Sequence, residues 1–346
     1  MTAGVAVPLV SQALERLAAR RDLGRELAAE VLGLIMDGRV GEVQAAGFLM
    51  GLRTKGETAE EIVGLAETMR RLAERVHVEA PDLVDTCGTG GDGLGTFNIS
   101  TTAAFVVAGA GVRVAKHGNR GATSRSGSAD LLEALGVRID LPPESVARCL
   151  DRTGIGFMFA PVHHKAMRHL VPVRRDLGIR TVFNFLGPLT NPAGARRQLV
   201  GVSAGGYVEV LAEALACMGA ERALVVHGEE GLDEVSVSGP TRVVEVSEGA
   251  VTAAYCVEPE ELGLGRWPLA ELTGGDPRQN AEITRAVLSG ESGARLDVTL
   301  ANAGAALYVA GAADSLAQGV ELARQSVESG KPREVVEALA AESRKG

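Results

Sequence analysis

A glycine-dense run at 85–93 (DTCGTGGDG) lies between a short apolar stretch and a run of small residues that begins near Ser100. This order predicts a strand, a loop and the start of a helix. Glycines lack a Cβ, so the backbone N–H groups of such a loop can approach an anion closely. A helix N-terminus adds oriented donors and a partial positive charge. A second loop of this kind, KHGNR at 116–120, follows shortly afterwards. Together the two loops predict a ligand with two separate phosphate groups.

From about residue 80 onward, short β-type runs alternate with helical stretches. We expect strands at 83–86, 112–115, 156–159, 199–202, 223–227, 242–246 and 252–257. Helices are expected between most of them, at 100–110, 127–135, 143–153 and 207–218, with more helices after residue 276. This alternation favours an α/β fold with a mostly parallel central sheet covered by helices. Ligands of open α/β sheets lie at the carboxyl ends of the strands, so the loops after residues 86, 115, 159 and 227 should converge on one crevice.

The first 76 residues have helical patterns and nothing that looks like a strand. Thr58 and Glu61 form a capping-box pattern, and apolar residues follow it at helical spacing. The segment at about 163–190 is expected to rejoin this N-terminal part. We therefore predict a small all-helical domain at 1–76, rejoined by 163–190, and a larger α/β domain at 77–346.

The composition excludes several classes of function. The chain has 346 residues, a net charge of −9 and only 3% aromatic residues, which disfavours a nucleic-acid partner. None of the four cysteines has the C-x-x-C spacing of a zinc or redox site. No segment resembles a signal peptide or the ~20 apolar residues of a membrane span. We expect free, buried thiols, a cytoplasmic location and no membrane partner.

Several polar residues are candidates for chemistry, each with a plainer alternative. Lys116 offers phosphate a point charge, and the backbone at 118–124 could wrap a pyrophosphate, although a solvated loop is the alternative. Asp233 and Glu234 suit Mg²⁺, although such pairs are often only solvated charge. Arg174 could hold a carboxylate or be a surface arginine.

The residues that follow the first loop have their own alternatives. Asn98, Ser100 and Thr101 could cap a helix whose free N–H groups point back at the loop. For Ser100, a plain capping role is as good an interpretation as a ligand-binding one. His117 is more typical of an oriented structural histidine than of a base. The first loop matches neither the dinucleotide fingerprint nor the P-loop, and a tight structural turn would also explain it.

In this order, the segments resemble the anthranilate phosphoribosyltransferases, within the nucleoside-phosphorylase-like transferases, over nearly the whole chain. The resemblance is carried by the motifs at 85–92, 97–101, 116–120, 127–130, 180–192 and 233–234. It implies a helical domain hinged to an α/β domain, a homodimer, and Mg²⁺ as cofactor. It also implies transfer of the phosphoribosyl group of phosphoribosyl pyrophosphate (PRPP) to the amine of anthranilate, giving N-(5-phosphoribosyl)anthranilate and pyrophosphate in tryptophan biosynthesis.

The resemblance also assigns roles to individual residues. The residues expected to bind PRPP are Gly88, Gly91, Asp92, Thr96, Asn98, Ser100, Thr101, Lys116, Gly118, Asn119, Ser124 and Ser128. Anthranilate is expected to contact Gly88, Asn119 and Arg174, and Mg²⁺ to contact Ser100, Asp233 and Glu234. Lys116, Asn119 and Arg174 are expected to be catalytic, and no general base is named. The alternatives are a pyrimidine nucleoside phosphorylase-like enzyme on the same fold and a non-enzymatic nucleotide- or nucleic-acid-binding relative.

Overall fold

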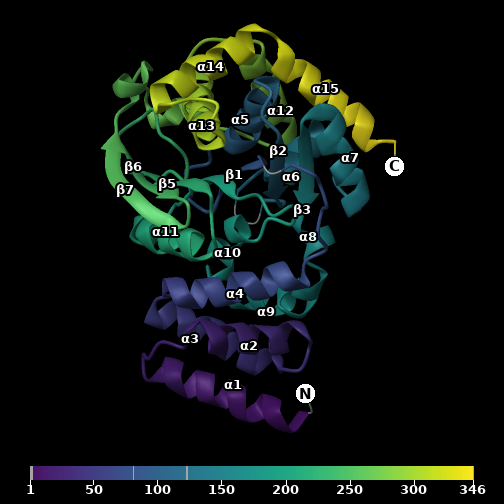
Figure 1. The fold of residues 1–346 in the computed structure, drawn as a ribbon, viewed down its shortest axis with the longest axis vertical. Helices are drawn as coiled ribbons and strands as arrows, with labels where there is room; N and C mark the ends of the chain where they lie inside the picture. Colours follow the sequence, from purple (N-terminus) through teal and green to yellow (C-terminus); the bar gives the residue numbers. More distant parts are fainter. Residues whose placement is uncertain (1–2, 81, 122–123, 346) are drawn as a thin grey trace.

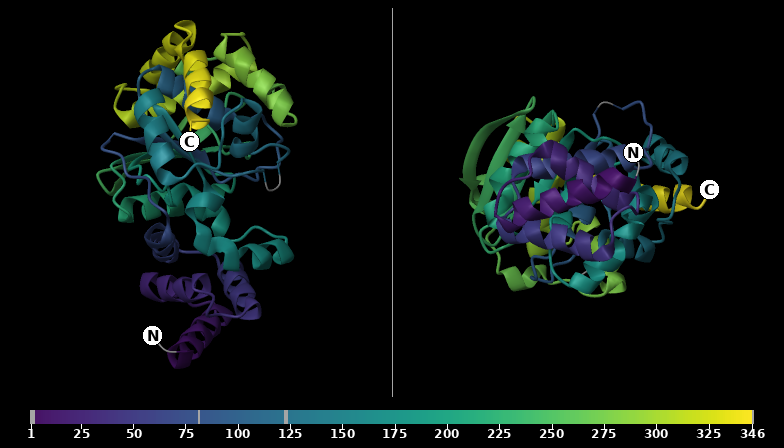
Figure 2. Two further views of the ribbon diagram at one scale, coloured as in Figure 1. Left: turned by 90° about the vertical axis from the view of Figure 1, so that its right-hand side faces the viewer. Right: turned by 90° about the horizontal axis from the view of Figure 1, so that it is seen from below.

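The computed structural model describes residues 3–80, 82–121 and 124–345. Figure 1 shows a layer of helices at one end of the long axis and a larger body built around a sheet at the other. The N-terminus lies at the helical end of this axis and the C-terminus lies on the side of the larger body, and Figure 2 shows the same separation when the molecule is turned about that axis. The predicted α/β fold with a small helical N-terminal part is confirmed.

Four helices form the N-terminal layer: α1 (Ala3–Ala18), α2 (Arg25–Met36), α3 (Glu42–Lys55) and α4 (Ala59–Leu72). The capping box predicted at the start of α4 is present. The backbone N–H of Glu61 donates to Thr58 Oγ1 at 3.3 Å, and the N–H of Thr58 donates to Glu61 Oε2 at 2.9 Å. Behind it, Ile62 and Leu65 are fully buried, so helical spacing had identified the inward face correctly.

All seven predicted strands are present and form one sheet, in the order β3-β2-β1-β4-β5-β6-β7. The strands are β1 (Val84–Gly88), β2 (Val114–Gly118), β3 (Ile155–Phe159), β4 (Arg197–Gly201), β5 (Arg222–Gly228), β6 (Thr241–Ser247) and β7 (Ala250–Val257). Strands β1 to β5 are parallel, and β6 and β7 are antiparallel to their neighbours. The parallel strands end at one edge of the sheet, where the predicted loops begin.

Helices cover both faces of this sheet. Those of the larger body are α5 (Ile99–Gly109), α6 (Ser128–Ala134), α7 (Pro143–Thr153), α11 (Val208–Cys217), α12 (Pro277–Leu288), α13 (Ala294–Ala310), α14 (Leu316–Glu328) and α15 (Lys331–Ser343). Short 3₁₀ helices lie at η2 (Gly205–Tyr207), η3 (Pro259–Leu262) and η4 (Leu269–Leu272). No helix in the described ranges is both long enough and apolar enough to cross a membrane.

Alternate residues of the central strands belong to two different cores. Leu199 and Leu224 pack into the core that contains α5 and α13, whereas Val200 and Val225 pack into the core that contains α2, α3 and α4. Successive strand residues point to opposite faces of a sheet. The helical layer therefore shares its core with one face of the sheet.

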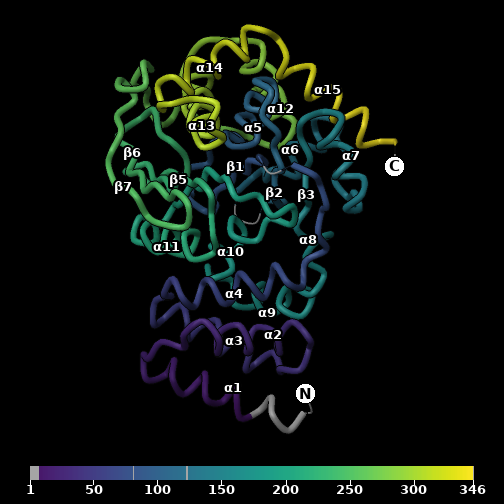
Figure 3. Tube along the Cα trace, in the orientation of Figure 1, coloured from purple at the N-terminus to yellow at the C-terminus, as the bar shows by residue number. Residues whose placement is uncertain are grey.

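The chain crosses between the two parts more than once, as the trace in Figure 3 shows. After β3 it runs through α8 (Ala160–His163), η1 (Lys165–His169), α9 (Val171–Leu177) and α10 (Phe183–Leu189) before it re-enters the sheet at β4. Helix α9 contacts α3, and α10 contacts α4. The two connecting segments are tied to each other, because the N–H of Val76 donates to the carbonyl of Pro192 at 3.1 Å.

Candidate active site

Two glycines make room for an acidic residue at the carboxyl ends of the central strands. Gly88 ends β1 and Gly201 ends β4, and the two are paired in the parallel ladder. A Cβ on Gly88 would lie 2.4 Å from Asp233 Oδ2, and one on Gly201 would lie 1.6 Å from the Asp233 carbonyl oxygen. Asp233 therefore lies directly over the two strand ends, and no residue larger than glycine fits at positions 88 and 201.

The acidic pair contacts both the first glycine loop and the helix that follows it. The N–H of Gly90 donates to Asp233 Oδ2 at 2.6 Å. The N–H of Ser100, in the first turn of α5, donates to Glu234 Oε1 at 3.1 Å. Residues more than 130 positions apart in the sequence thus meet at one edge of the sheet, and the three predicted metal-contacting residues lie together.

Burial destabilises the charges of this pair. It raises the pKa of Asp233 to about 6, and the neighbouring Asp92 adds to the effect. Burial and the charge of Asp233 raise the pKa of Glu234 well above its usual range, which Lys116 partly opposes. Buried like charges of this kind gain most from a cation beside them. Within the described ranges no cluster of three or more His, Cys, Asp and Glu side chains could form a complete metal cage, but Mg²⁺ commonly takes one or two carboxylates and completes its shell with water and substrate phosphate.

Lys116 is buried beneath the first turn of α5 and is only 2% exposed. Its Nζ donates to the Thr86 carbonyl oxygen at 2.5 Å and lies 3.4 Å from Ser100 Oγ. Burial lowers the pKa of Lys116, and the nearby Asp85 carboxylate opposes that change. The cation therefore lies beside Ser100 and near the Glu234 carboxylate, rather than extending into solvent as a free side chain.

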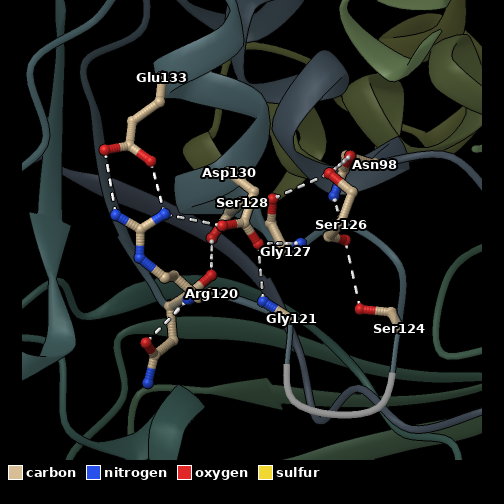
Figure 4. A network of polar contacts seen from close by, with 10 residues as sticks. Asn98, Arg120, Gly121, Ser124, Ser126, Gly127, Ser128, Asp130 and Glu133 are labelled. Carbon is tan, nitrogen blue, oxygen red and sulfur yellow. Dashed lines mark hydrogen bonds and ion pairs between the residues drawn. The ribbon is translucent and has the colours of Figure 1, made fainter. Parts of the chain in front are cut away.

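The second loop is tied to the start of α5 (Figure 4). The Asn98 side chain donates to the Ser126 carbonyl oxygen at 3.0 Å and accepts from Ser126 Oγ at 3.1 Å. Ser128 Oγ donates to the carbonyl oxygen of Asn119 at 3.2 Å. Gly118 packs so closely on Ser128 that a Cβ would lie 2.1 Å from its Oγ. Residues 122–123 of the predicted phosphate-binding stretch 116–124 lie outside the described residues.

The predicted capping of α5 is wrong in its detail. Asn98 is the N-cap residue, but its side chain makes no capping hydrogen bond and turns to Ser126. Ser100 and Thr101 lie inside the first turn of the helix. The amide of Asn98 finds partners in the neighbouring loop, so α5 begins without a cap from its own N-cap side chain, and the Glu234 carboxylate accepts from the Ser100 N–H instead.

The remaining predicted PRPP residues lie along the same two loops. Arg180 Nη1 donates to the Gly91 carbonyl oxygen at 2.7 Å. Asp92 Oδ1 accepts from the Leu94 N–H at 3.1 Å. Thr96 forms an isolated bridge with Thr273, and Ser124 Oγ donates to the Ser126 carbonyl oxygen at 3.2 Å.

Arg174 lies half-buried on α9, in the crossover segment. Its guanidinium is 5.2 Å from the centre of the Phe183 ring, a cation–π contact. Burial lowers its pKa. Among the residues that the structure describes, none forms a hydrogen bond or an ion pair with this guanidinium, which therefore has the capacity to take an external carboxylate.

Three histidines meet beside the end of β2. His117 and His163 each direct Nδ1 at a backbone carbonyl oxygen, of Gly187 and Glu74, while the buried Nε2 atoms of His117, His163 and His164 have no partner in the described structure. Burial lowers the pKa of His117 to about 3 and that of His164 to about 4. These rings are neutral near pH 7, which agrees with the interpretation of His117 as a structural residue.

Two positioning residues were missed by sequence reasoning. Arg180 holds the first loop from the crossover segment, as described above, and Asn280 on α12 donates to Asn98 Oδ1 at 2.8 Å. Arg180 lies in the motif at 180–192 that carries the family resemblance, and this motif is the sequence signal that could have identified it. Asn280 has no such signal, because an asparagine within a helix is ordinarily a surface residue.

Comparison with known proteins gives consistent matches over nearly the whole chain. Residues 80–333 match the model of the glycosyl transferase family a/b domain, and residues 11–73 match that of the glycosyl transferase family helical bundle domain. Anthranilate phosphoribosyltransferase of Rubrobacter xylanophilus is 56% identical over 339 residues, 97% of this chain and 98% of that protein. The enzyme of the same name from Symbiobacterium thermophilum is 55% identical over 326 residues, 94% of this chain and 95% of that protein.

Solved structures show the same likeness in three dimensions. The crystal structure of anthranilate phosphoribosyltransferase from Thermus thermophilus is 48% identical, has a TM-score of 0.91 and is matched over 96% of this chain and 99% of that one. The Saccharomyces cerevisiae enzyme, in complex with PRPP and Mg, is 28% identical with a TM-score of 0.89, over 97% of this chain and 98% of that one.

Proposed function

Because the chain belongs to the anthranilate phosphoribosyltransferase family, we propose that its reaction takes place in the crevice where the first glycine loop, Lys116 and the acidic pair meet. The chain is a glycosyltransferase that transfers the phosphoribosyl group of PRPP to the amine of anthranilate, a reaction of tryptophan biosynthesis. The contact of Asp233 with Gly90 and of Glu234 with Ser100 carries the assignment of the site.

Mg²⁺ is proposed as the cofactor, held by Asp233, Glu234 and Ser100. The support is the raised pKa of both buried carboxylates, which a divalent cation would relieve, and the Mg in the yeast relative. When bound, the ion supplies positive charge to the departing pyrophosphate. Lys116, buried beneath Ser100, adds a second fixed positive charge on the same side of the crevice.

PRPP is proposed to lie against the two loops. Gly88, Gly91, Asp92 and Thr96 belong to the first loop and its continuation. Asn98, Ser100 and Thr101 are at the start of α5, and Gly118, Asn119, Ser124 and Ser128 are around the second loop. Backbone donors at a helix N-terminus and in glycine loops suit phosphate oxygens. One donor, the Ser100 N–H, is already taken by Glu234, so the phosphates must use the others.

Arg174 is proposed to hold the carboxylate of anthranilate, with Gly88 and Asn119 at the amine. The support is the half-buried Arg174 guanidinium, which has no anionic partner in the described residues. The amine lone pair of anthranilate is free at neutral pH, so positioning rather than deprotonation prepares the nucleophile. It attacks C1′ opposite the leaving pyrophosphate as oxocarbenium character develops, which inverts that carbon. No residue of the crevice is assigned as a general base, and the neutral His117 is not needed as one.

The division of the chain is also a proposal: a helical domain at 1–76, rejoined by 163–190, and an α/β domain at 77–346 that closes over the substrates. The packing of α9 and α10 against α3 and α4 supports it. A homodimer is proposed through the N-terminal helices, because Val43 and Met50 are 87% and 36% exposed one heptad apart on α3. A cytoplasmic location agrees with the four free cysteines. The expectation that these thiols are buried holds for Cys87 and Cys149 and is wrong for Cys217 and Cys256, which are exposed.

A direct assay tests the proposed reaction. The chain is incubated with PRPP, Mg²⁺ and anthranilate, and the loss of anthranilate fluorescence is followed, with the product identified by its mass. We expect turnover that stops when Mg²⁺ is removed with EDTA. No turnover, together with phosphorolysis of a pyrimidine nucleoside, would overturn the proposal.

A further inference from the structure

One carboxylate gathers both ends of the segment 121–127, as Figure 4 shows. Asp130, in the first turn of α6, accepts hydrogen bonds on Oδ2 from the N–H of Gly121 at 2.9 Å and from the N–H of Gly127 at 2.8 Å. Its other oxygen, Oδ1, accepts from Arg120 Nη1 at 2.9 Å. The two ends of the segment 121–127 are thus bound to one side chain.

The two ends are in backbone contact, and we call this contact the loop neck. A Cβ on Gly127 would lie 2.2 Å from the Gly121 nitrogen and 2.4 Å from the carbonyl carbon of Arg120. Only glycine fits at residue 127 in this arrangement. Backbone N–H groups in such close contact each need an acceptor. One carboxylate oxygen of Asp130 accepts from both the Gly121 and the Gly127 N–H.

Arg120 is held on the outer side of the neck by a second carboxylate. Its Nη1 and Nη2 donate to Glu133 Oε2 and Oε1 at 2.5 and 3.0 Å, and its guanidinium lies 5.6 Å from the centre of the Phe159 ring. The charge of Arg120 is therefore balanced by Asp130 and Glu133. Although Arg120 belongs to the KHGNR motif, its guanidinium is already paired with these two carboxylates.

The inner side of the neck faces the residues proposed to bind PRPP. Ser126, inside the bound segment, is joined to Asn98 at the start of α5, and Ser128, just after it, donates to the Asn119 carbonyl oxygen. Burial pushes the pKa of Asp130 upward, but the hydrogen bonds from Gly121 and Gly127 and the neighbouring Arg120 outweigh it and hold the pKa below its usual range. The carboxylate is therefore ionised at neutral pH.

We propose that Asp130 is a positioning residue for PRPP. It touches no substrate, and it closes the loop neck so that Asn119, Ser124 and Ser128 present their polar groups to a phosphate of PRPP. This inference rests on the proposed function of the second loop. It predicts that Asp130, the acidic residue of the motif at 127–130, affects the affinity for PRPP rather than the overall stability or the affinity for anthranilate.

The test compares Asp130→Leu with the matched control Glu133→Gln. The leucine keeps the approximate size of the side chain but offers no acceptor to the Gly121 and Gly127 N–H groups, which both donate to one carboxylate oxygen. The control removes the other carboxylate of Arg120 and leaves the neck intact. We expect Asp130→Leu to raise the KM for PRPP at least tenfold with the KM for anthranilate changed less than twofold, and Glu133→Gln to change both less than twofold. An unchanged KM for PRPP, or an equal rise in both KM values, would overturn the proposal.

A second variant keeps the test informative if Asp130→Leu does not fold. Gly127→Ala forces the same neck open while Asp130 remains, and it should produce the same split between the two KM values. Trypsin cleavage after Arg125 gives a readout without turnover. It should be faster in Asp130→Leu than in wild type, and equal rates would count against the neck. Failure of the proposed function itself would appear separately, as a wild-type protein that does not transfer the phosphoribosyl group.

Discussion

Replacing Gly201, at the end of β4, by alanine would push the backbone of Asp233 away from the strand end and so displace the acidic pair Asp233 and Glu234. The new Cβ would lie 1.6 Å from the Asp233 carbonyl oxygen and 2.3 Å from the carbonyl carbon, whereas real Cβ contacts essentially never fall under 3.0 Å. Both atoms in the way belong to the backbone, so no side-chain rotation relieves the clash. Either the 233–234 segment or the end of β4 must move by more than an ångström.

The size of the effect follows from that displacement. Overpacking of this kind costs roughly 1–3 kcal/mol of unfolding free energy. With an unfolding entropy of about 2.1 cal/mol/K per residue, this lowers Tm by roughly 1–4 °C for a chain of 346 residues. A misplacement of about 1 Å in a catalytic group can cost roughly 100-fold in rate. We therefore expect Gly201→Ala to lose at least tenfold in kcat and to need more Mg²⁺ for half-maximal activity.

Scanning fluorimetry and the anthranilate fluorescence assay measure the two effects on the same preparation. Gly206→Ala is the matched control, because a Cβ there meets no atom within 4 Å, and its Tm and kcat should equal those of the wild type. Gly201→Ala with wild-type kcat and Mg²⁺ dependence would refute the reasoning, since the acidic pair would then tolerate displacement or lie outside the chemistry.

Three further outcomes are expected. Arg174→Ala should raise the KM for anthranilate at least tenfold and leave the KM for PRPP unchanged. The control Arg175→Ala, at an exposed neighbouring residue, should change neither KM. An unaltered KM for anthranilate in Arg174→Ala would remove Arg174 from the site. The double variant Asp233→Asn, Glu234→Gln should lose turnover or need at least tenfold more Mg²⁺, and wild-type metal dependence would reduce the pair to surface charge. Burial raises the pKa of Asp85 from 3.8 to about 6, so the folded chain binds this proton more tightly than the unfolded chain does. Its contribution to stability should therefore fall by roughly 3 kcal/mol as pH rises from about 4 to 6, and urea denaturation in a pH series should show this step, which Asp85→Asn should lack.

The strands and most helices could be predicted because their signals are local. Runs of β-branched residues between turn residues located all seven strands, and the capping box located α4. The antiparallel pairing of β6 and β7 also has a local signal in the sequence. Only Glu248 and Gly249 separate the two strands, both with positive φ, 49° and 75°. A two-residue turn of this kind joins antiparallel strands, whereas a parallel pair needs a long crossover.

The meeting of the acidic pair with the first loop could also be anticipated, because parallel strands bring their carboxyl ends to one edge. The hydrogen-bond partners within the crevice could not. Asn98 looked like a helix cap, yet its amide binds Ser126. Lys116 looked like a free cation, yet its ammonium group is buried against the Thr86 carbonyl oxygen. Such choices depend on distances between loops, and these are set by packing of the whole sheet rather than by neighbouring residues.

A crystal structure of the chain with PRPP and Mn²⁺ in place of Mg²⁺ would test the central claim most directly, since the anomalous signal of manganese locates the ion without ambiguity. We expect the ion within coordination distance of Asp233 or Glu234, with the pyrophosphate between it, the glycine loop at 88–92 and the start of α5. An ion and a pyrophosphate bound on another face of the protein would contradict the account.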